Sequence, residues 1–479
     1  MAVIGAGFSG TLTAVHLARL SAGTVSVTLI DKQKRFARGV AYGTEDPSHL
    51  LNVPVAKMGA YAREPEHFLR WCHEHPEHCR AAGIETNVPA GSFIPRKLYG
   101  DYLQDVLEDT RRRWPSLRLL EGEVADLKLK PDGRLAAQFA DGQVLNAARV
   151  VLAVGNFPPG DPKLRDQRFH TSGRYLTDPW AAATVERLSE PGDILVLGSG
   201  LTALDLLLSL AKRRHDHGII YLISRRGLFP QPHASYVPCP PPLHAPTLPK
   251  TAREALHLVR KASKQATESG SDWRAIMDAL RPSTQTIWQQ WDWVERRRFL
   301  RHLRAYWEPH RHRASPEALA IKQDLETRGR LVCYRGRVQS IAENAAALEV
   351  EFVEFRRREA RRLEVSYVVN CTGPECNYHK LKDPLVMQLF LRGLITPDPL
   401  FLGIEVGPDG SVYNVYRERV PNLYTLGSPQ KGRLLETTAV PELRVQAEAL
   451  AQRLCRDLYR IEPVTVEAAG NEPASAYEI

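Results

Sequence analysis

Two glycine-rich turns, each between an apolar strand and a helix, predict an α/β protein with two Rossmann-like dinucleotide-binding domains. The first turn is GAGFSG at residues 5–10, and the second is GSGLTALD at residues 198–205. A third observation adds a helical insertion, because five of the eight tryptophans lie between residues 273 and 307, where apolar residues recur at helical spacing. The predicted fold class is therefore α/β with two dinucleotide-binding domains and one helical insertion.

The first unit runs strand, turn, helix, strand. Its strands are expected at 2–4 and 25–30, the helix between them carries apolar residues at helical spacing from Leu12, and the second strand ends at Asp31. The rest of this domain is expected to contain helices at 65–73 and 98–111 and strands at 118–123 and 138–144, up to the segment VVLAVGNFPPG at 150–160.

The second unit begins at Asp193 and repeats the pattern. A helix is expected at 202–213 and a strand at 219–223, followed by a proline-rich segment and the insertion. Ser315 before Pro316 predicts a helix start, with serine as the cap and proline at the first helical position. The remaining elements are expected as strands at 330–338, along the alternating segment to Glu354 and at 366–374, a helix from about Pro441, and a loose tail after Val466.

The composition is ordinary for a globular chain, with 25% charged and 43% hydrophobic residues among 479. The longest apolar helix candidate, around 204–210, contains Asp205 and is too short for a membrane span. The net charge of +9 is scattered, so it favours anionic small ligands and predicts no nucleic-acid partner. The densest basic run, RRREARR at 356–362, is expected at a solvated hairpin tip.

Seven cysteines, an odd number, and the lack of a secretory leader favour a reducing cytoplasmic location. The segment CHEHPEHC at 72–79 has zinc-ligand residue types, but its spacing is too crowded and no second ligand pair follows. We expect a helix end with a polar face there and no metal site.

The residues at the end of each second strand distinguish the ligands expected at the two dinucleotide sites. Asp31 lies 26 residues after Gly5, where an acid accepts hydrogen bonds from ribose hydroxyls. Ser224 lies 26 residues after Gly198 and is followed by Arg225 and Arg226, which would bind a 2′-phosphate. The second site is therefore expected to bind NADPH. Two structural turns with coincidental spacing are the alternative, more so at the second turn, where Ala203 replaces the third glycine.

The segments AVGN at 153–156 and CTGP at 371–374 resemble the crossover segments of flavoproteins with separate FAD and NADPH domains. More narrowly, RGVAYGT (38–44), HLLNVP (49–54), FIPRKLYGDYL (93–103), SRRGLFPQPH (224–233) and ETTAVPELRVQA (436–447) resemble the bacterial FAD/NAD(P)-binding oxidoreductase family. That family is similar to the class B flavoprotein monooxygenases and amino-acid N-hydroxylases. The segment CTGPECNYH resembles an N-hydroxylase motif that ends in histidine, which here is His379.

The resemblance implies three parts: 1–162 as the first part of the FAD domain, 163–365 as the NADPH domain with the insertion at about 232–325, and 366–479 as the returning FAD part and C-terminal tail. It also implies that the last strand and helix close over the flavin, although Ser428 follows Gly427 where the family has aspartate. The residues expected to bind the cofactors are Gly5, Gly7, Gly10, Asp31, Asn52, Gly155, Gly198, Gly200, Ser224, Arg225, Arg226, Gly373, Gly427 and Thr437, and the candidates for catalysis beside the flavin are Asn52, Asn156 and His379.

The expected function is an FAD-dependent, NADPH-consuming oxidoreductase, most plausibly a monooxygenase of the N-hydroxylase kind that uses oxygen and a small substrate carrying an amine and a carboxylate. The carboxylate candidates are Arg301, His302, Arg311 and Arg313, for which a solvated helix face is the alternative. Two other functions remain open: a reductase that passes electrons to a quinone, disulfide or protein, and a flavin-binding scaffold without catalysis. Cys371 and Cys376 have the spacing of a redox pair, but their place in the chain favours packing.

Overall fold

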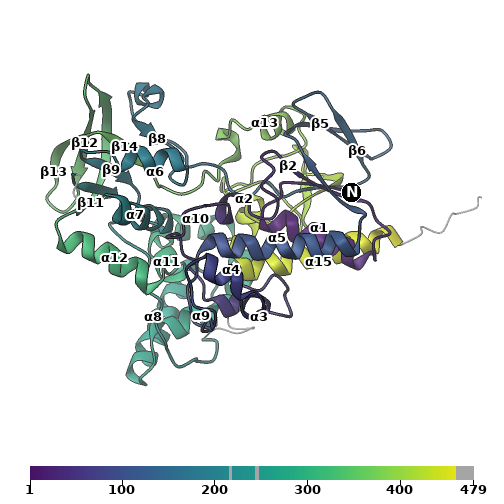
Figure 1. Cartoon of the computed structure of the whole chain (residues 1–479), viewed down its shortest axis with the longest axis horizontal. Coiled ribbons are helices and arrows are strands. Elements are labelled where there is room, and N and C mark those ends of the chain that lie inside the picture. The colour runs from purple at the N-terminus through teal and green to yellow at the C-terminus, as the bar shows by residue number, and fades with distance from the viewer. Residues whose placement is uncertain (215–217, 243–247, 460–479) are drawn as a thin grey trace, which may run out of the picture.

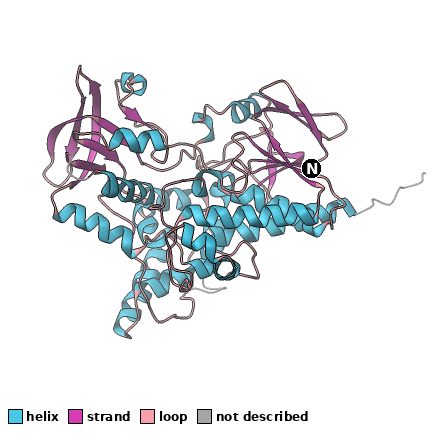
Figure 2. Cartoon of the chain, viewed as in Figure 1, coloured by secondary structure: helices cyan, strands magenta, loops and turns pink. Residues whose placement is uncertain are grey.

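The computed structural model describes residues 1–214, 218–242 and 248–459, and places two strand-rich regions at opposite ends of the molecule (Figures 1 and 2). Long helices lie between and below them, with the first and last helices side by side. The expected tail after Val466 lies outside the described residues.

The first sheet is built from the two ends of the chain. Its strand order is β15-β16-β7-β1-β2-β3, and all neighbours except β15 and β16 pair in parallel. The strands are β1 (Ala2–Ile4), β2 (Val27–Asp31), β3 (Leu117–Glu121), β7 (Val150–Leu152), β15 (Ser411–Tyr413) and β16 (Arg419–Thr425). An antiparallel meander of β4 (Val124–Leu129), β5 (Leu135–Phe139) and β6 (Val144–Ala147) stands beside it.

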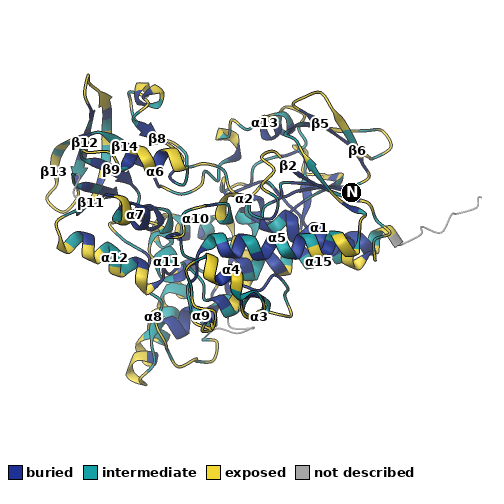
Figure 3. Cartoon of the chain, viewed as in Figure 1, coloured by how far each residue is buried: buried dark blue, intermediate teal, exposed yellow. Residues whose placement is uncertain are grey.

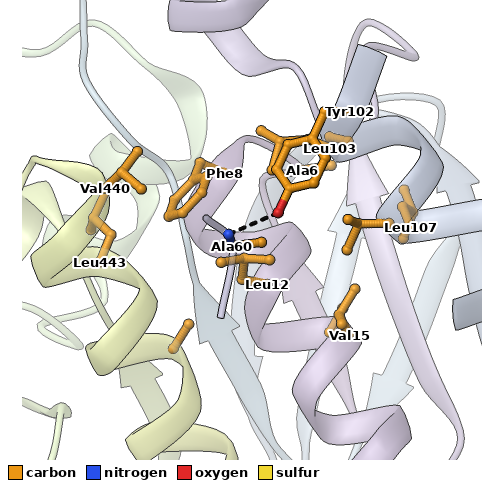
Figure 4. Packing of buried hydrophobic residues seen from close by; sticks show 14 of the residues in the cluster. Ala6, Phe8, Leu12, Val15, Ala60, Tyr102, Leu103, Leu107, Val440 and Leu443 are labelled. Carbon is orange, nitrogen blue, oxygen red and sulfur yellow. Dashed lines mark hydrogen bonds between the residues drawn. The ribbon is translucent and has the colours of Figure 1, made fainter. Parts of the chain in front are cut away.

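Three helices form the core on one face of this sheet. They are α1 (Phe8–Leu20), α5 (Arg96–Arg113) and the C-terminal α15 (Val440–Tyr459). Buried residues of all three meet in one cluster, where Leu12, Leu103 and Leu443 pack together and the Ala60 amide donates to Tyr102 Oη at 2.9 Å (Figure 4). Because α1 is buried along most of its length, its apolar residues occupy nearly every face (Figure 3). The smaller elements of this lobe are α2 (Gly39–Tyr42), η1 (Val55–Lys57), α3 (His67–Glu74), α4 (Pro76–Ala81), η3 (Tyr378–Lys380), α13 (Pro384–Leu391), η4 (Ser428–Gln430) and α14 (Lys431–Leu434).

The second sheet has the order β13-β12-β11-β10-β9-β14-β8. Its parallel part follows the expected strand, helix, strand pattern, with α7 (Leu201–Arg213) between β9 (Ile194–Leu197) and β10 (Ile220–Ser224). The other elements are η2 (Arg168–Thr171), β8 (Tyr175–Leu176), α6 (Ala182–Leu188), α12 (Pro316–Thr327), β11 (Leu331–Glu343), β12 (Leu348–Glu354), β13 (Glu359–Val365) and β14 (Tyr367–Asn370). The predicted fold class, with two Rossmann-like domains and a helical insertion, is confirmed.

The insertion contains α8 (Ala252–Glu268), α9 (Trp273–Gln290), α10 (Trp293–His302) and α11 (Arg304–Arg311). Its core of tryptophans and aliphatic residues also includes Leu402 and Leu435 from the returning part of the chain. Trp288, at 1% exposure, donates from Nε1 to the Gly432 carbonyl at 3.0 Å. The insertion therefore packs on the first lobe, although in sequence it is inserted into the second lobe.

Several sequence boundaries need correction. The strand expected at 138–144 is a hairpin, because Asp141 and Gly142 form a turn between β5 and β6. The boundary expected after residue 365 is too early, since β14 pairs with β9 and β8 of the second sheet. The insertion ends before 325, because α12 packs on α7.

Two other local predictions are confirmed, the helix cap at Ser315 and the exposed basic hairpin turn. Ser315 caps α12 by accepting the Ala318 amide at 3.2 Å, and the turn between β12 and β13 contains the exposed start of the run RRREARR. In CHEHPEHC, the rings of His75 and His78 pack on Trp71. Among the described residues no group of ligands suits a metal ion, and no helix is long and apolar enough to cross a membrane.

The Trp288 contact predicts how the insertion is held. Trp288→Ala should lower the free energy of unfolding by ~3–5 kcal/mol, since it leaves a large cavity, and Trp288→Phe by ~1–3 kcal/mol, since the Gly432 carbonyl loses its buried donor. Denaturant unfolding followed by circular dichroism measures both. Trp293→Ala is the control, because Trp293 is 58% exposed; an equal loss in all three variants would contradict this packing.

Candidate functional site

The first glycine-rich turn is held against β7 by backbone contact. Gly5 has φ +99°, and a Cβ there would lie 2.3 Å from the Ala153 carbonyl oxygen. A Cβ on Gly10 would lie 1.9 Å from the Gly5 oxygen, while Gly7 caps the N-terminus of α1. Gly5 and Gly10 therefore have steric reasons to be glycine, whereas a Cβ on Gly7 would make only an ordinary contact with Gly39 at 3.6 Å. The amides that begin α1 are left to face a pyrophosphate.

The second turn repeats this geometry. Gly198 has φ +103°, and a Cβ would lie 2.5 Å from the Cys371 carbonyl oxygen. Gly200 caps α7, and Ala203 at the third position is fully buried. The two turns thus meet their crossover strands in the same way, so coincidental spacing does not explain the second turn.

The two crossover segments run beside each other between the lobes. Pro159 and Pro374 form an antiparallel bridge, and the Glu375 amide donates to the Pro158 carbonyl at 3.1 Å. Gly155 and Gly373, which belong to these segments, have φ of +68° and +90°, and apart from their chain neighbours no described residue has an atom within 4 Å of where either Cβ would be. Both glycines leave open space beside a turn.

The returning chain closes on the first turn. A Cβ on Gly427, where φ is +76°, would lie 3.4 Å from Ser9 Oγ of that turn. Thr437 Oγ1 donates to the Gly427 carbonyl at 3.1 Å, and the Gly427 amide donates to Gln446 Oε1 at 3.1 Å. Ser428 Oγ donates to Asn156 Oδ1 at 2.6 Å. The structure therefore brings together Gly427, Thr437 and Asn156, which the sequence predicted separately.

Asp31 ends β2 at the adjoining edge of the sheet. Its Oδ1 accepts the Gln33 and Arg35 amides at 2.9 and 3.0 Å, while Oδ2 has no hydrogen bond to any described residue. One oxygen thus shapes the loop and the other is available to a ribose.

Ser224 ends β10 at the equivalent place. Its Oγ accepts the Gly227 amide at 3.0 Å and lies 2.9 Å from Ser199 Oγ of the second turn. Arg225 and Arg226 are exposed, and the Arg226 guanidinium stands 5.9 Å from the Tyr306 ring. Ser224 therefore shapes the loop, and the arginines supply its free positive charge.

Asn52 lies where the first lobe meets the insertion. Its carbonyl accepts His233 Nε2 at 3.0 Å, and burial with the nearby Arg313 charge lowers the pKa of His233 to about 4. His233 is therefore neutral near pH 7. Arg313, 5% exposed, pairs with Asp278, while its Nε and Nη1 have no hydrogen-bond partner among the residues that the structure describes.

The other predicted cationic groups divide into two kinds. Arg311 is buried and lies 3.3 Å from both Glu436 and Glu442, so it serves packing, whereas Arg301 and His302 are exposed. The exposed ring of His379 stacks on Phe390 at 4.6 Å and makes no hydrogen bond to a described residue. A catalytic role for His379 stays a prediction that its surroundings do not support.

A polar network that the sequence did not reveal joins the lobes. Thr44 Oγ1 donates to His49 Nδ1, His49 Nε2 to Ser209 Oγ, and Ser209 to Asp46, at 2.7, 2.9 and 2.7 Å. These contacts tie the loop after α2 to α7, the helix that begins at the second turn. The motif HLLNVP pointed to this segment, but no spacing in the sequence shows its partner.

Arg96 and Gly39 are two further residues that sequence reasoning did not assign. Arg96, at the start of α5, pairs with the buried Asp205 of α7 at 3.0 Å. Gly39 has φ +54°, and a Cβ there would lie 2.8 Å from the Gly7 Cα. Gly39 belongs to the motif RGVAYGT and lets two backbones approach closely. Arg96 belongs to the motif FIPRKLYGDYL and forms an ion pair between the two lobes.

Comparison with known proteins agrees with this geometry. Residues 2–157 match the profile of an FAD-NAD(P)-binding family. A search of curated proteins finds no match.

Solved structures share the fold over nearly the whole chain. The fold is similar to that of L-lysine 6-monooxygenase from Pseudomonas syringae, at 18% identity and a TM-score of 0.64, over 95% of this chain and 98% of that one. It is also similar to an ornithine N-hydroxylase from Kutzneria (15%, TM-score 0.62, 95% and 99% covered) and to a cadaverine monooxygenase from Erwinia amylovora (15%, TM-score 0.62, 100% and 99% covered). The resemblance in fold that the motifs indicated is confirmed.

The Asp31 geometry predicts a measurable loss of cofactor. The purified protein should be yellow, and Asp31→Ala should weaken FAD binding 10- to 100-fold, because hydrogen bonds to a charged acceptor contribute ~1.5–3 kcal/mol. Absorbance near the flavin maximum during reconstitution measures the affinity. Asp31→Asn keeps an oxygen for the loop amides and should lose less, while Asp132→Ala in an exposed turn is the control. A protein that takes up no FAD would contradict the assignment.

Proposed function

We propose that the protein is an FAD-dependent, NADPH-consuming monooxygenase that hydroxylates an amine nitrogen of a small substrate that also carries a carboxylate. The observation that carries this is the pair of turns with equal backbone geometry, joined by bridged crossovers. The similarity in fold to solved lysine, ornithine and cadaverine monooxygenases supports it. The net reaction converts amine, oxygen, NADPH and a proton to hydroxylamine, water and NADP⁺.

The residues of the first lobe fit an FAD. Gly5 and Gly10 let the turn pack directly on the Ala153 and Gly5 carbonyls, where a Cβ would collide, and the amides at the N-terminus of α1 would then face the pyrophosphate of FAD. Asp31 Oδ2 would accept from the ribose, and Ser428 and Thr437 would line the end nearest the returning chain. When bound, FAD supplies the redox chemistry with oxygen, and the protein has to position and shield it.

The residues of the second lobe fit NADPH. Gly198 and Gly200 open the N-terminus of α7 to a pyrophosphate, and Arg225 and Arg226 stand where a 2′-phosphate would lie. The His49, Ser209 and Arg96, Asp205 contacts hold α7 at a set position on the first lobe. This fixed position would keep the hydride donor and its acceptor in register.

The substrate is expected between the first lobe and the insertion. Asn52 and the neutral His233 meet there, and Arg313 keeps two buried N–H groups without partners, which suits a carboxylate. The insertion covers this region and would exclude water from the reaction.

The reductase alternative finds less support in the described residues. Cys371 is 2% exposed and burial raises its pKa, so its thiolate is disfavoured, and Cys376 donates to the Pro374 carbonyl. Cys371 and Cys376 are therefore poorly suited to relaying electrons to a disulfide.

Coenzyme preference tests the second site. Arg225→Ala with Arg226→Ala should raise the KM for NADPH at least tenfold and leave the KM for NADH nearly unchanged, because only NADPH carries the 2′-phosphate. Steady-state oxidation of each coenzyme measures this. Arg356→Ala with Arg357→Ala, in the exposed hairpin turn, is the matched control, and equal effects on both coenzymes would show that the pair does not read the phosphate.

Oxygen chemistry tests the class of reaction. Rapid mixing of reduced protein with oxygen should give a transient absorbance that differs from the reduced and the reoxidised spectra, and NADPH loss with an amine substrate should yield hydroxylamine. Direct reoxidation, with electrons passing only to quinones or disulfides, would make the protein a reductase. A lack of NADPH consumption with any amine would favour the scaffold.

A further inference from the structure

A cavity of about 280 Å³ lies between α10 of the insertion and α14 of the returning chain. Its lining includes Trp293, Arg296, Leu400, Ile404, Glu405 and Arg433, and we call it the α10–α14 pocket. The volume would hold about nine water molecules at ~30 Å³ each, which is enough for a metabolite of amino-acid size. None of the predicted cofactor or catalytic residues lines it, so it is a separate site.

Two charged groups of opposite sign, Arg433 and Glu405, line this pocket without forming a direct pair. The half-buried Arg433 and Glu405 side chains make no hydrogen bond or ion pair with any described residue. Burial raises the pKa of Glu405 and the charge of Asp398 adds to this, while the charges of Arg417, Arg296 and Arg433 oppose it, so the carboxylate lies near cationic groups without being paired to one of them. A ligand that brings one charge of each sign would satisfy both groups.

The other charged groups of the pocket are fixed by the protein. Arg296 donates from Nε to the Trp288 carbonyl at 2.9 Å and from Nη2 to the Gln289 carbonyl at 3.1 Å. Asp398 accepts the Leu400 and Leu402 amides at 2.9 and 2.6 Å. Arg296 thus adds a positioned positive charge near Arg433. Asp398 is held by backbone amides on both of its oxygens, whereas the Glu405 carboxylate accepts no hydrogen bond from a described residue and is the acid more open to a cation.

Apart from Gln289, the remaining lining is apolar. Ile404 is 2% exposed, and Gly432 is packed so that a Cβ would lie 2.2 Å from the Asp398 carboxyl carbon. Trp293 stands at the rim with 58% exposure. A short aliphatic chain would therefore lie between the charged ends.

We propose that the α10–α14 pocket binds a small aliphatic zwitterion, with its carboxylate on Arg433 and Arg296 and its ammonium on Glu405. A ligand bound there would contact α14, which leads directly to Glu436 and Thr437 of the returning chain. The inference goes beyond the proposed function and needs no turnover.

Titration calorimetry on the FAD-loaded full-length protein, without NADPH, tests this with a matched set of compounds. The zwitterions 6-aminohexanoate and L-norleucine differ in charge separation, and hexanoate and hexylamine each lack one charge. At least one zwitterion should bind, and hexanoate and hexylamine should each bind at least tenfold more weakly.

Two variants assign the charges. Arg433→Gln should weaken zwitterion and hexanoate binding tenfold or more and spare hexylamine, whereas Glu405→Gln should weaken zwitterion and hexylamine binding and spare hexanoate. Neither removes a hydrogen bond of the described fold, and circular dichroism with FAD content checks this. Arg356→Gln is the control and should change nothing.

The proposal is wrong if neither zwitterion binds at millimolar concentration, or if both variants bind as the parent does, which would place the ligand elsewhere. Loss of hydroxylation with intact zwitterion binding would count against the proposed function alone. Intact hydroxylation without zwitterion binding would count against this pocket alone.

Discussion

The close approach of two backbones at the start of each nucleotide-binding unit is the constraint on which the rest of the structure depends. The Ala153 carbonyl occupies the space of a Gly5 side chain, and the Cys371 carbonyl does the same at Gly198. Any larger residue would push the turn off its crossover strand and move the helix that follows it. Since α1 and α7 both begin at such a turn, two carbonyl contacts fix where the N-termini of both helices lie.

The insertion adds a second constraint, made of charge. Arg281 forms a bidentate pair with Glu442 at 2.6 and 2.7 Å, and Trp307 Nε1 donates to Glu436 at 2.9 Å. Burial would raise the pKa of Glu436, but the charges of His312 and Arg311 outweigh it and lower the pKa. A buried acid paired in this way is costly to expose singly, so these contacts specify where the insertion docks more than how stable it is. The insertion docks on the returning chain at Glu436, and the next residue, Thr437, contacts Gly427. The insertion therefore helps to position the returning chain beside the first turn.

The sequence predicted the parts whose signals are local. The glycines of both turns, Asp31, Ser224 and the cap at Ser315 follow from short-range spacing, and the structure places each at the end or start of the expected element. The strand at 138–144 was wrong because an aspartate–glycine turn was overlooked inside an alternating pattern. The boundary at 365 was wrong because β14 pairs with β9, and strand pairing between distant segments leaves no mark in either segment.

The contacts that join the lobes lay beyond sequence reasoning for the same reason. His49 meets Ser209 across 160 residues, and Arg96 meets Asp205 across 109. Each residue alone looks like an ordinary polar surface residue, and only the fold shows that His49, Ser209 and Asp205 are buried. Gly155 and Gly373 lie in the crossover segments with open space beside them, so the crossovers alone do not fix how the two lobes are arranged. The two side-chain pairs hold α7, the helix that begins at the second turn, against the first lobe and thereby favour one arrangement. His49, Arg96 and their partners therefore help to set the distance between the two glycine-rich turns.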